Sequence, residues 1–119
     1  MKEPLPALAN LDPVIHETGR MMIVALLAAV RECDFLYVLR ETGLDKGDLL
    51  IHWAKLEQAG YVEMETRNRV KAPKRLLRLT PSGRTAFEAY RKKLNEALAE
   101  QLKLASDMRK SSKRKSGAS

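Results

Sequence analysis

The most informative part of the chain is residues 45–67, which read DKGDLLIHWAKLEQAGYVEMETR. In the first half of this segment the apolar residues are spaced as one stripe of an α-helix, at Leu49, Trp53 and Leu56. Asp45 can cap the start of this helix, and Gly60 can end it. Over 61–66 apolar and acidic residues alternate, as in a half-buried strand. The segment therefore predicts a helix over 46–59 that leads directly into a strand.

Three further helices are predicted upstream, and each has a start signal. Thr18 opens the longer one, in which apolar residues recur at helical spacing at Met22, Ile23, Leu26, Leu27 and Val30. Asp34 opens the shorter one, and Thr42-Gly43-Leu44 forms the turn after it, because glycine easily adopts the left-handed conformation that ends a helix. Asp12-Pro13 is one more start signal and predicts a short helix before Thr18.

Downstream, the sequence predicts a β-hairpin and a long final helix. A second strand over 75–79 follows a basic loop at 68–74, so the hairpin has a basic tip. Thr80-Pro81 opens the final helix, whose apolar stripe continues to about Met108. The fold class that follows is mainly α with a small β-hairpin (α+β).

The length of 119 residues suits one compact domain. We expect a flexible leader over 1–11, a folded domain over 12–108 whose last helix spans 81–108, and a disordered basic tail over 109–119. The longest apolar stretch is about half of what a membrane-spanning helix needs, and the first residues lack the pattern of a signal peptide. We therefore expect a cytoplasmic protein with no membrane contact.

Charge is distributed unevenly along the chain. The formal net charge is +7, from 22 basic and 15 acidic side chains. Residues 1–60 carry 6 basic and 9 acidic side chains, whereas residues 61–119 carry 16 and 6. A strongly basic half favours a polyanionic partner, and the second half should supply most of its binding surface.

Two short helices joined by a glycine turn and followed by a hairpin with a basic tip have the order of a helix-turn-helix and its wing. The runs KLEQAGYV at 55–62 and LTPSGR at 79–84 closely resemble the winged helix-turn-helix transcriptional regulators of the MarR and ArsR superfamily. DPVIHE at 12–17 and FEAY at 87–90 are similar to the small branch of that group that has no effector domain. The resemblance covers about residues 11–100. It implies a DNA-binding regulator that acts as a homodimer on double-stranded DNA.

By this resemblance, 45–59 is the recognition helix, which enters the major groove. The residues expected to face DNA are Lys46, Gly47, Asp48, Leu50, Ile51 and Lys55. Leu50 and Ile51 can touch a thymine methyl group, but they cannot form the bidentate hydrogen bonds that distinguish guanine or adenine. The alternative is a protein–protein interaction module that uses the same apolar face.

A basic cluster lies at the expected wing. It consists of Arg67, Arg69, Lys71, Lys74 and Arg75. Such a run beside a helix-turn-helix favours a phosphate clamp over a solvated charge run. A second basic cluster, in the tail, fits phosphate contacts and a role in solubility equally well: Arg109, Lys110, Lys113, Arg114 and Lys115.

The final helix should be roughly 40 Å long at 1.5 Å per residue, which exceeds the diameter of a domain of this size. Part of its apolar stripe must then find another partner, and a second copy is the economical one. The residues expected at this dimer interface are Phe87, Tyr90, Leu94, Leu98 and Leu102. The alternative is that the stripe serves only the chain's own core. A small-molecule effector, if there is one, should bind at the dimer interface.

Residue types that would carry catalysis or bind a metal are scarce. Cys33 is the single cysteine, which excludes an intramolecular disulfide and a cysteine-based zinc site, and His16 and His52 lack metal-ligand spacing. Neighbouring acids should raise the pKa of the Cys33 thiol and keep it inert. His52 is expected to pack or hydrogen-bond at the edge of its helix. With no nucleophile elbow or phosphate-binding glycine loop, we expect no enzyme activity, cofactor or metal.

Overall fold

The computed structural model describes residues 9–68 and 74–117, and the side chains of that last range up to residue 111. Two of the predicted wing residues, Arg69 and Lys71, therefore lie outside the described residues. Contacts divide the chain into two units, Asp12–Tyr90 and a second unit of Met1–Leu11 with Arg91–Ser119.

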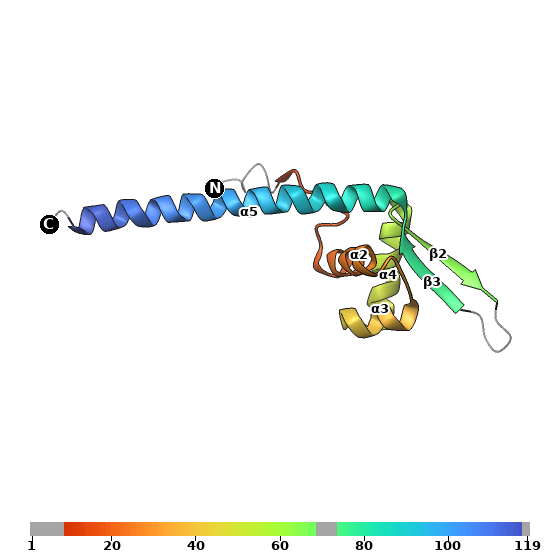
Figure 1. Cartoon of the computed structure of the whole chain (residues 1–119). Coiled ribbons are helices and arrows are strands. Elements are labelled where there is room, and N and C mark those ends of the chain that lie inside the picture. The colour runs from red at the N-terminus through yellow and green to blue at the C-terminus, as the bar shows by residue number, and fades with distance from the viewer. Residues whose placement is uncertain (1–8, 69–73, 118–119) are drawn as a thin grey trace. The chain divides into compact units, whose positions relative to one another are not determined.

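The described residues of the Asp12–Tyr90 unit form three helices, three strands and the start of a fourth helix. Figure 1 shows their arrangement. In chain order the elements are α2 (Thr18–Val30), β1 (Glu32–Asp34), α3 (Phe35–Thr42), α4 (Lys46–Gln58), β2 (Val62–Arg67), β3 (Lys74–Leu79) and α5 (Pro81–Gly117). The predicted fold class, mainly α with a β-hairpin, is confirmed. The hairpin of β2 and β3, here called the wing, follows directly from α4.

The sheet is antiparallel and has the strand order β1-β3-β2. Val62 lies opposite Leu79 at the base of the wing, and Arg67 lies opposite Lys74. β1 adds Cys33 opposite Leu77 on the other side of β3. The sequence did not predict β1, because three residues are too few to show an alternation.

The core of this unit lies between the helices and one face of the sheet. Its buried members are Ile23, Val24, Leu27, Val38, Leu49, Trp53, Leu56, Val62, Leu77 and Leu79. The predicted stripe of α4 is therefore confirmed. The indole N–H of Trp53 is buried and has no hydrogen-bond partner among the described residues, so this large side chain acts through packing.

Most predicted helix caps are confirmed. The Asp34 carboxylate accepts the N–H of Tyr37 at the start of α3, and Asp45 accepts the N–H of Asp48 at the start of α4, both at 2.8 Å. Gly43 ends α3 with φ of 71°, the left-handed conformation that favours glycine. α2 starts at Thr18 as predicted, but its cap is the Glu17 side chain.

The short helix predicted from Asp12-Pro13 is wrong, because these residues form turns. The Asp12 carboxylate still accepts the N–H of Val14 at 2.9 Å, but it also accepts the hydroxyl of Tyr61. That hydrogen bond, burial and the Asp12 charge raise the pKa of Tyr61 to about 12. Asp12 thus ties the start of the unit to the base of the wing.

The junction between α2 and β1 is strained. Arg31 has φ of 69° and ψ of −59°, and it is the one non-glycine residue with positive φ in the described part of the chain. This conformation lies close to that of a rare, strained γ-turn and costs on the order of 1–3 kcal/mol in a non-glycine residue.

A close backbone contact fixes the start of α5 to the base of the wing. A Cβ atom added at Gly83 would lie 2.0 Å from the carbonyl oxygen of Tyr61, so only glycine fits. Thr80 reinforces the contact: its hydroxyl donates to the carbonyl of Gly60 and accepts the N–H of Gly83 at 3.0 Å.

α5 is longer than predicted. It runs for 37 residues to Gly117, so the expected helix end near Met108 and the expected disorder of the tail are wrong for residues 109–117. The tail lacks an apolar face, but Lys and Arg are good helix formers and no proline interrupts them. Most of the predicted flexible leader, residues 1–8, lies outside the described residues, and Leu11 at its end is buried. None of the described helices is both long and apolar enough to cross a membrane.

Candidate nucleic-acid interface

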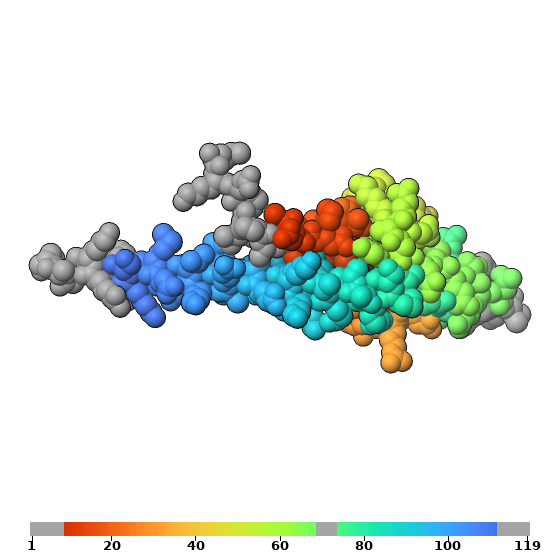
Figure 2. Space-filling model, turned by 90° about the horizontal axis from the view of Figure 1, so that it is seen from above, coloured from red at the N-terminus to blue at the C-terminus, as the bar shows by residue number. Residues whose placement is uncertain are grey.

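The outer side of α4 is the first part of the candidate interface. Every residue of this helix predicted to face DNA is exposed, and Ala54 beside them is exposed too: Lys46, Gly47, Asp48, Leu50, Ile51, Ala54 and Lys55. We call this set the exposed face of α4. Leu50 is 44% exposed and Ile51 is 58% exposed, which is unusual for adjacent aliphatic side chains. Figure 2 shows part of α4, in yellow-green, at the molecular surface.

Polar contacts hold α4 against the start of α2. The Nδ1 atom of His52 lies 3.3 Å from the Glu17 carboxylate and 3.4 Å from the Arg20 guanidinium. Partial burial would raise the pKa of Glu17, but the backbone N–H groups of Arg20 and Gly19, followed by the charges of His52 and Arg20, outweigh it and lower this pKa. His52 is therefore a hydrogen-bonded residue at the edge of α4, as predicted.

The exposed face of α4 has few groups that can read a base edge by hydrogen bonding. Lys46 and Lys55 are donors at its two ends, and Asp48 is an acceptor in the first turn, where its charge also favours the helix N-terminus. A carboxylate can accept from the amino group of cytosine, and a lysine can donate to guanine. Between these groups the surface is aliphatic.

The wing strands carry the second part of the candidate interface. Arg75 is exposed and has no charged partner among the described residues, and Lys74 is half-buried. Arg67, in contrast, forms an ion pair with Glu65 at 3.2 Å. The described wing cations therefore differ in how freely they can meet a phosphate.

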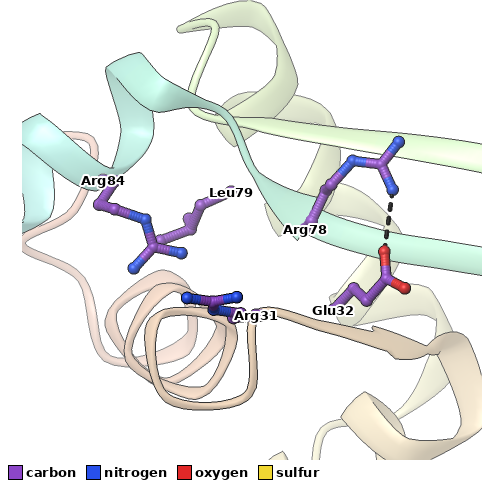
Figure 3. A pocket seen from close by; sticks show the side chains of 5 residues that line it. All are labelled: Arg31, Glu32, Arg78, Leu79 and Arg84. Carbon is purple, nitrogen blue, oxygen red and sulfur yellow. Dashed lines mark hydrogen bonds and ion pairs between the residues drawn. The ribbon is translucent and has the colours of Figure 1, made fainter.

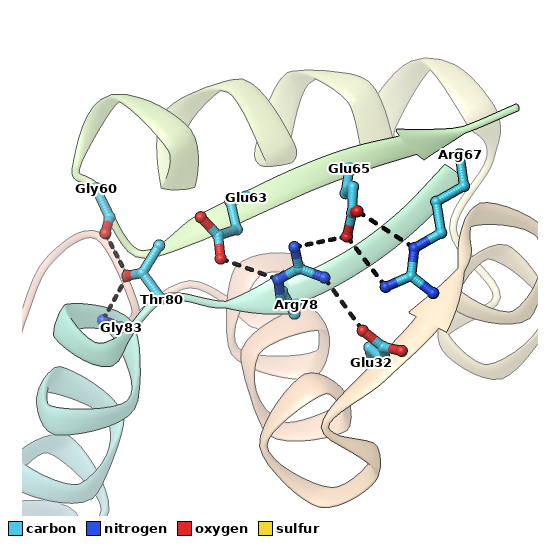
Figure 4. Close-up of polar contacts among 8 residues, drawn as sticks. All are labelled: Glu32, Gly60, Glu63, Glu65, Arg67, Arg78, Thr80 and Gly83. Carbon is cyan, nitrogen blue, oxygen red and sulfur yellow. Dashed lines mark hydrogen bonds and ion pairs between the residues drawn. The ribbon is translucent and has the colours of Figure 1, made fainter. Parts of the chain in front are cut away.

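A cluster that the sequence did not predict lies on the outer face of the sheet (Figure 4). The Arg78 guanidinium contacts Glu63 and Glu65 at 2.9 Å and Glu32 at 3.1 Å, so that it bridges all three strands. Arg78, and then Arg67, lower the pKa of the Glu65 carboxyl. The feature that could have revealed this cluster is the register of the hairpin, which places Glu63 directly opposite Arg78.

The predicted dimer residues fall into two groups. Phe87 packs against the core of its own unit, and Tyr90 is only 3% exposed, with its hydroxyl 2.9 Å from His16 and 3.3 Å from the Met21 sulfur. Tyr90 therefore belongs to the core, and Phe87 is partly buried against it. Leu94 is half-buried, whereas Leu98 and Leu102 are exposed. The prediction missed two more exposed apolar residues of α5, Leu104 and Met108.

Cys33 and the histidines show no sign of reactive chemistry. Cys33 is half-buried, and burial followed by the charge of Asp34 raises the pKa of its thiol to about 11. A thiol with such a pKa is a poor nucleophile at neutral pH. The described residues contain no group of three or more His, Cys, Asp or Glu side chains that could hold a metal ion.

Two helices joined at Gly43 and followed by a β-hairpin define the winged-helix class of protein. A family model of winged helix DNA-binding domains matches residues 20–98, more than half of the chain, and the chain belongs to this family. A curated relative is the uncharacterized protein MJ0432 of Methanocaldococcus jannaschii, which is 34% identical over 80 residues, 65% of this chain and 84% of the relative.

Solved structures share the fold. A transcriptional regulator homologue from Pyrococcus horikoshii superposes with a TM-score of 0.76 at 18% identity, covering 82% of this chain and 98% of the other. A putative MarR-family regulator from Enterococcus faecalis gives a TM-score of 0.68 at 20% identity, covering 83% and 86%. NadR in complex with 4-hydroxyphenylacetate gives 0.60 at 19%, covering 86% and 80%. At these sequence identities the comparison shows a shared fold and nothing further. That fold is the MarR-like winged helix that the sequence resembles.

Proposed function

We propose that this chain is a transcriptional regulator that places α4 in the major groove of double-stranded DNA and sets its wing on the flanking phosphates. The observation that carries the proposal is the orientation of α4. Leu49, Trp53 and Leu56 hold one side of the helix in the core, while the opposite side is uncovered. A helix of this kind fits the width of the major groove.

The charges around α4 support a polyanionic partner. Lys46 and Lys55 lie at the two ends of its exposed face, and Arg75 and Lys74 lie on the wing. In the sequence, Arg69 and Lys71 add two more positive charges to this hairpin. Phosphate contacts of this kind set the position of a protein on DNA and supply most of its salt-dependent affinity.

The proposal includes a homodimer formed through α5. Leu102 is 70% exposed and Met108 is 73% exposed, and Leu98 and Leu104 are also exposed. A second copy of the helix could cover these side chains and present two α4 helices to half-sites about one DNA turn apart. An effector bound at this interface is a further part of the proposal; a small molecule is present in the structure of NadR, which shares the fold.

The salt dependence of DNA binding tests the proposed interface. For the full chain and a mixed-sequence duplex, log K should fall linearly with log salt, with a slope of about −0.9 per phosphate contact. The double variant Arg69→Ala with Lys71→Ala should flatten that slope. A matched control is Lys92→Ala with Lys93→Ala, which removes the same charge from exposed positions of α5. If the two double variants gave equal salt slopes, the wing tip would not be part of the DNA interface.

Sedimentation velocity tests the dimer. The wild-type chain should sediment as a dimer at micromolar concentration, and Leu98→Glu with Leu102→Glu should shift it to the monomer, because charges cannot be buried unpaired in an apolar seam. Gln101→Glu adds a charge beside the stripe and serves as control. A wild-type monomer at this concentration would contradict the dimer.

The exposure of Leu50 and Ile51 favours a second candidate function, which is docking of another protein on the exposed face of α4. The salt experiment separates the two candidates. DNA binding requires salt-sensitive duplex affinity that the wing variant weakens, whereas protein docking would survive the wing variant and need no duplex.

A further inference from the structure

A surface pocket lies on the Asp12–Tyr90 unit, away from the exposed face of α4. It has a volume of about 630 Å³ and is bounded by Arg31, Glu32, Arg78, Leu79 and Arg84 (Figure 3). These residues come from the end of α2, from β1 and β3, and from the first turn of α5. Three of the five are arginines, so the pocket concentrates positive charge.

The three arginines are not equivalent. Arg78 is already surrounded by the carboxylates of Glu32, Glu63 and Glu65 at 2.9–3.1 Å. Arg31 and Arg84 have no such counter-ion among the described residues. In Figure 3 their guanidinium groups approach each other from α5 and from the end of α2, below Leu79 in this view. Two like charges brought together repel each other unless an anion lies between them.

The backbone at Arg31 adds a second, independent observation. Its φ of 69° would suit glycine, yet the position carries a long cationic side chain. Residues held in such conformations cluster at functional and ligand-binding sites. The backbone of Arg84 is held in the first turn of α5, because its N–H donates to the carbonyl of Thr80 at 2.9 Å.

We infer that Arg31 and Arg84 form a binding site for a small molecule that carries a phosphate group. The planar forks of two guanidinium groups suit the oxygens of a phosphate, each through paired N–H donors. The pocket is much larger than a phosphate ion and falls in the range of sites for small organic ligands. The apolar part of the pocket wall is the edge of Leu79, a core residue that is 6% exposed.

The site is separate from the proposed DNA interface. None of the lining residues belongs to α4 or to the wing tip. The inference therefore does not depend on DNA binding, and either one can fail without the other.

The test uses the full chain with inorganic phosphate and ribose 5-phosphate as probes. Binding is followed by ³¹P line broadening and by the shift in unfolding temperature at constant ionic strength. Ribose 5-phosphate should bind more tightly than inorganic phosphate. Arg31→Gly and Arg84→Gln should each weaken its binding about tenfold, as expected for the loss of charge-assisted hydrogen bonds.

Arg31→Gly also shows whether a loss of phosphate binding comes from the pocket itself or from a less stable fold. Without ligand its unfolding temperature should equal or exceed that of the wild type, because glycine relieves the strain at this position. Arg40→Gln, which removes an exposed arginine outside the pocket, should leave phosphate binding unchanged.

Three results would overturn the inference. The first is that neither probe binds the wild-type chain, and the second is that both pocket variants bind as the wild type does. The third is that the pocket variants lose affinity for duplex DNA while phosphate esters do not bind, which would make the pocket a clamp for the DNA backbone.

Discussion

The exposed face of α4 and the wing offer different chemistry to the same proposed partner. On α4 the centre of the surface is aliphatic, through Leu50 and Ile51, with a lysine near each end. The wing strands instead carry charges, some of them free, like Arg75, and some already paired, like Arg67 with Glu65. The wing is therefore suited to affinity for any duplex, whereas α4 is suited to shape and methyl contacts at particular base pairs.

The largest expected effect lies where the wing joins the body of the domain. Gly83→Ala would force a Cβ atom against the Tyr61 carbonyl, and no rotamer change can relieve a clash with backbone. We expect a loss of about 3 kcal/mol in the free energy of unfolding, measured by urea denaturation.

Gly47→Ala on α4 is the matched control for this substitution. The nearest atom to its Cβ would be an Asp45 carboxylate oxygen at 3.4 Å, which can move. This variant should be unchanged or more stable by up to about 1 kcal/mol, because alanine is the better helix former. If Gly83→Ala were as stable as Gly47→Ala, the wing would not be locked to α5 as described.

A second, smaller effect should distinguish the free and paired cations of the wing. Arg75→Gln should lower duplex affinity roughly fivefold at 0.1 M salt and reduce the magnitude of the salt slope by about 0.9. Arg67→Gln should change both quantities less, because Glu65 already offsets its charge. Fluorescence anisotropy over a series of salt concentrations measures both. Equal effects would mean that Arg67 leaves Glu65 when DNA binds.

The smallest effect tests the aliphatic part of α4. Replacing thymine by uracil in a selected binding site removes methyl groups and leaves the phosphates unchanged. Removal of one methyl group that touches α4 should weaken binding about fourfold, from the roughly 0.8 kcal/mol of one buried apolar carbon, with no change in salt slope. A variant with Leu50→Ala and Ile51→Ala should be insensitive to the replacement. Equal wild-type affinity for both duplexes would favour protein docking on this face.

The sequence predicted α4 and its surroundings well, because their signals are local. A stripe at helical spacing fixes which side of α4 is buried, and that side fixes the exposed residues. The caps Asp34 and Asp45 act within three residues of themselves. The same logic predicted the wing, because the apolar and acidic residues of its first strand alternate and a basic loop follows in the sequence.

Features that depend on distant partners could not be predicted in this way. β1 is a strand only because β3 lies beside it, and Arg78 gains its third carboxylate from β1, 46 residues earlier. Tyr90 fits the apolar stripe of an interface, but it is covered by His16 and Met21 from far earlier in the chain. The tail has no apolar face to indicate a helix, although helix propensity alone allows one there.

The contact at Gly83 has a mechanical consequence. There is no free space between the Gly83 backbone and the Tyr61 carbonyl, and the Thr80 hydroxyl is hydrogen-bonded to both Gly60 and Gly83. The connection between the wing and α5 is therefore rigid. Any rotation of the first turn of α5 must then carry the start of β2 with it. The base of the wing is therefore not a hinge, because the wing strands could move relative to the first turn of α5 only if the contact between Gly83 and Tyr61 were broken.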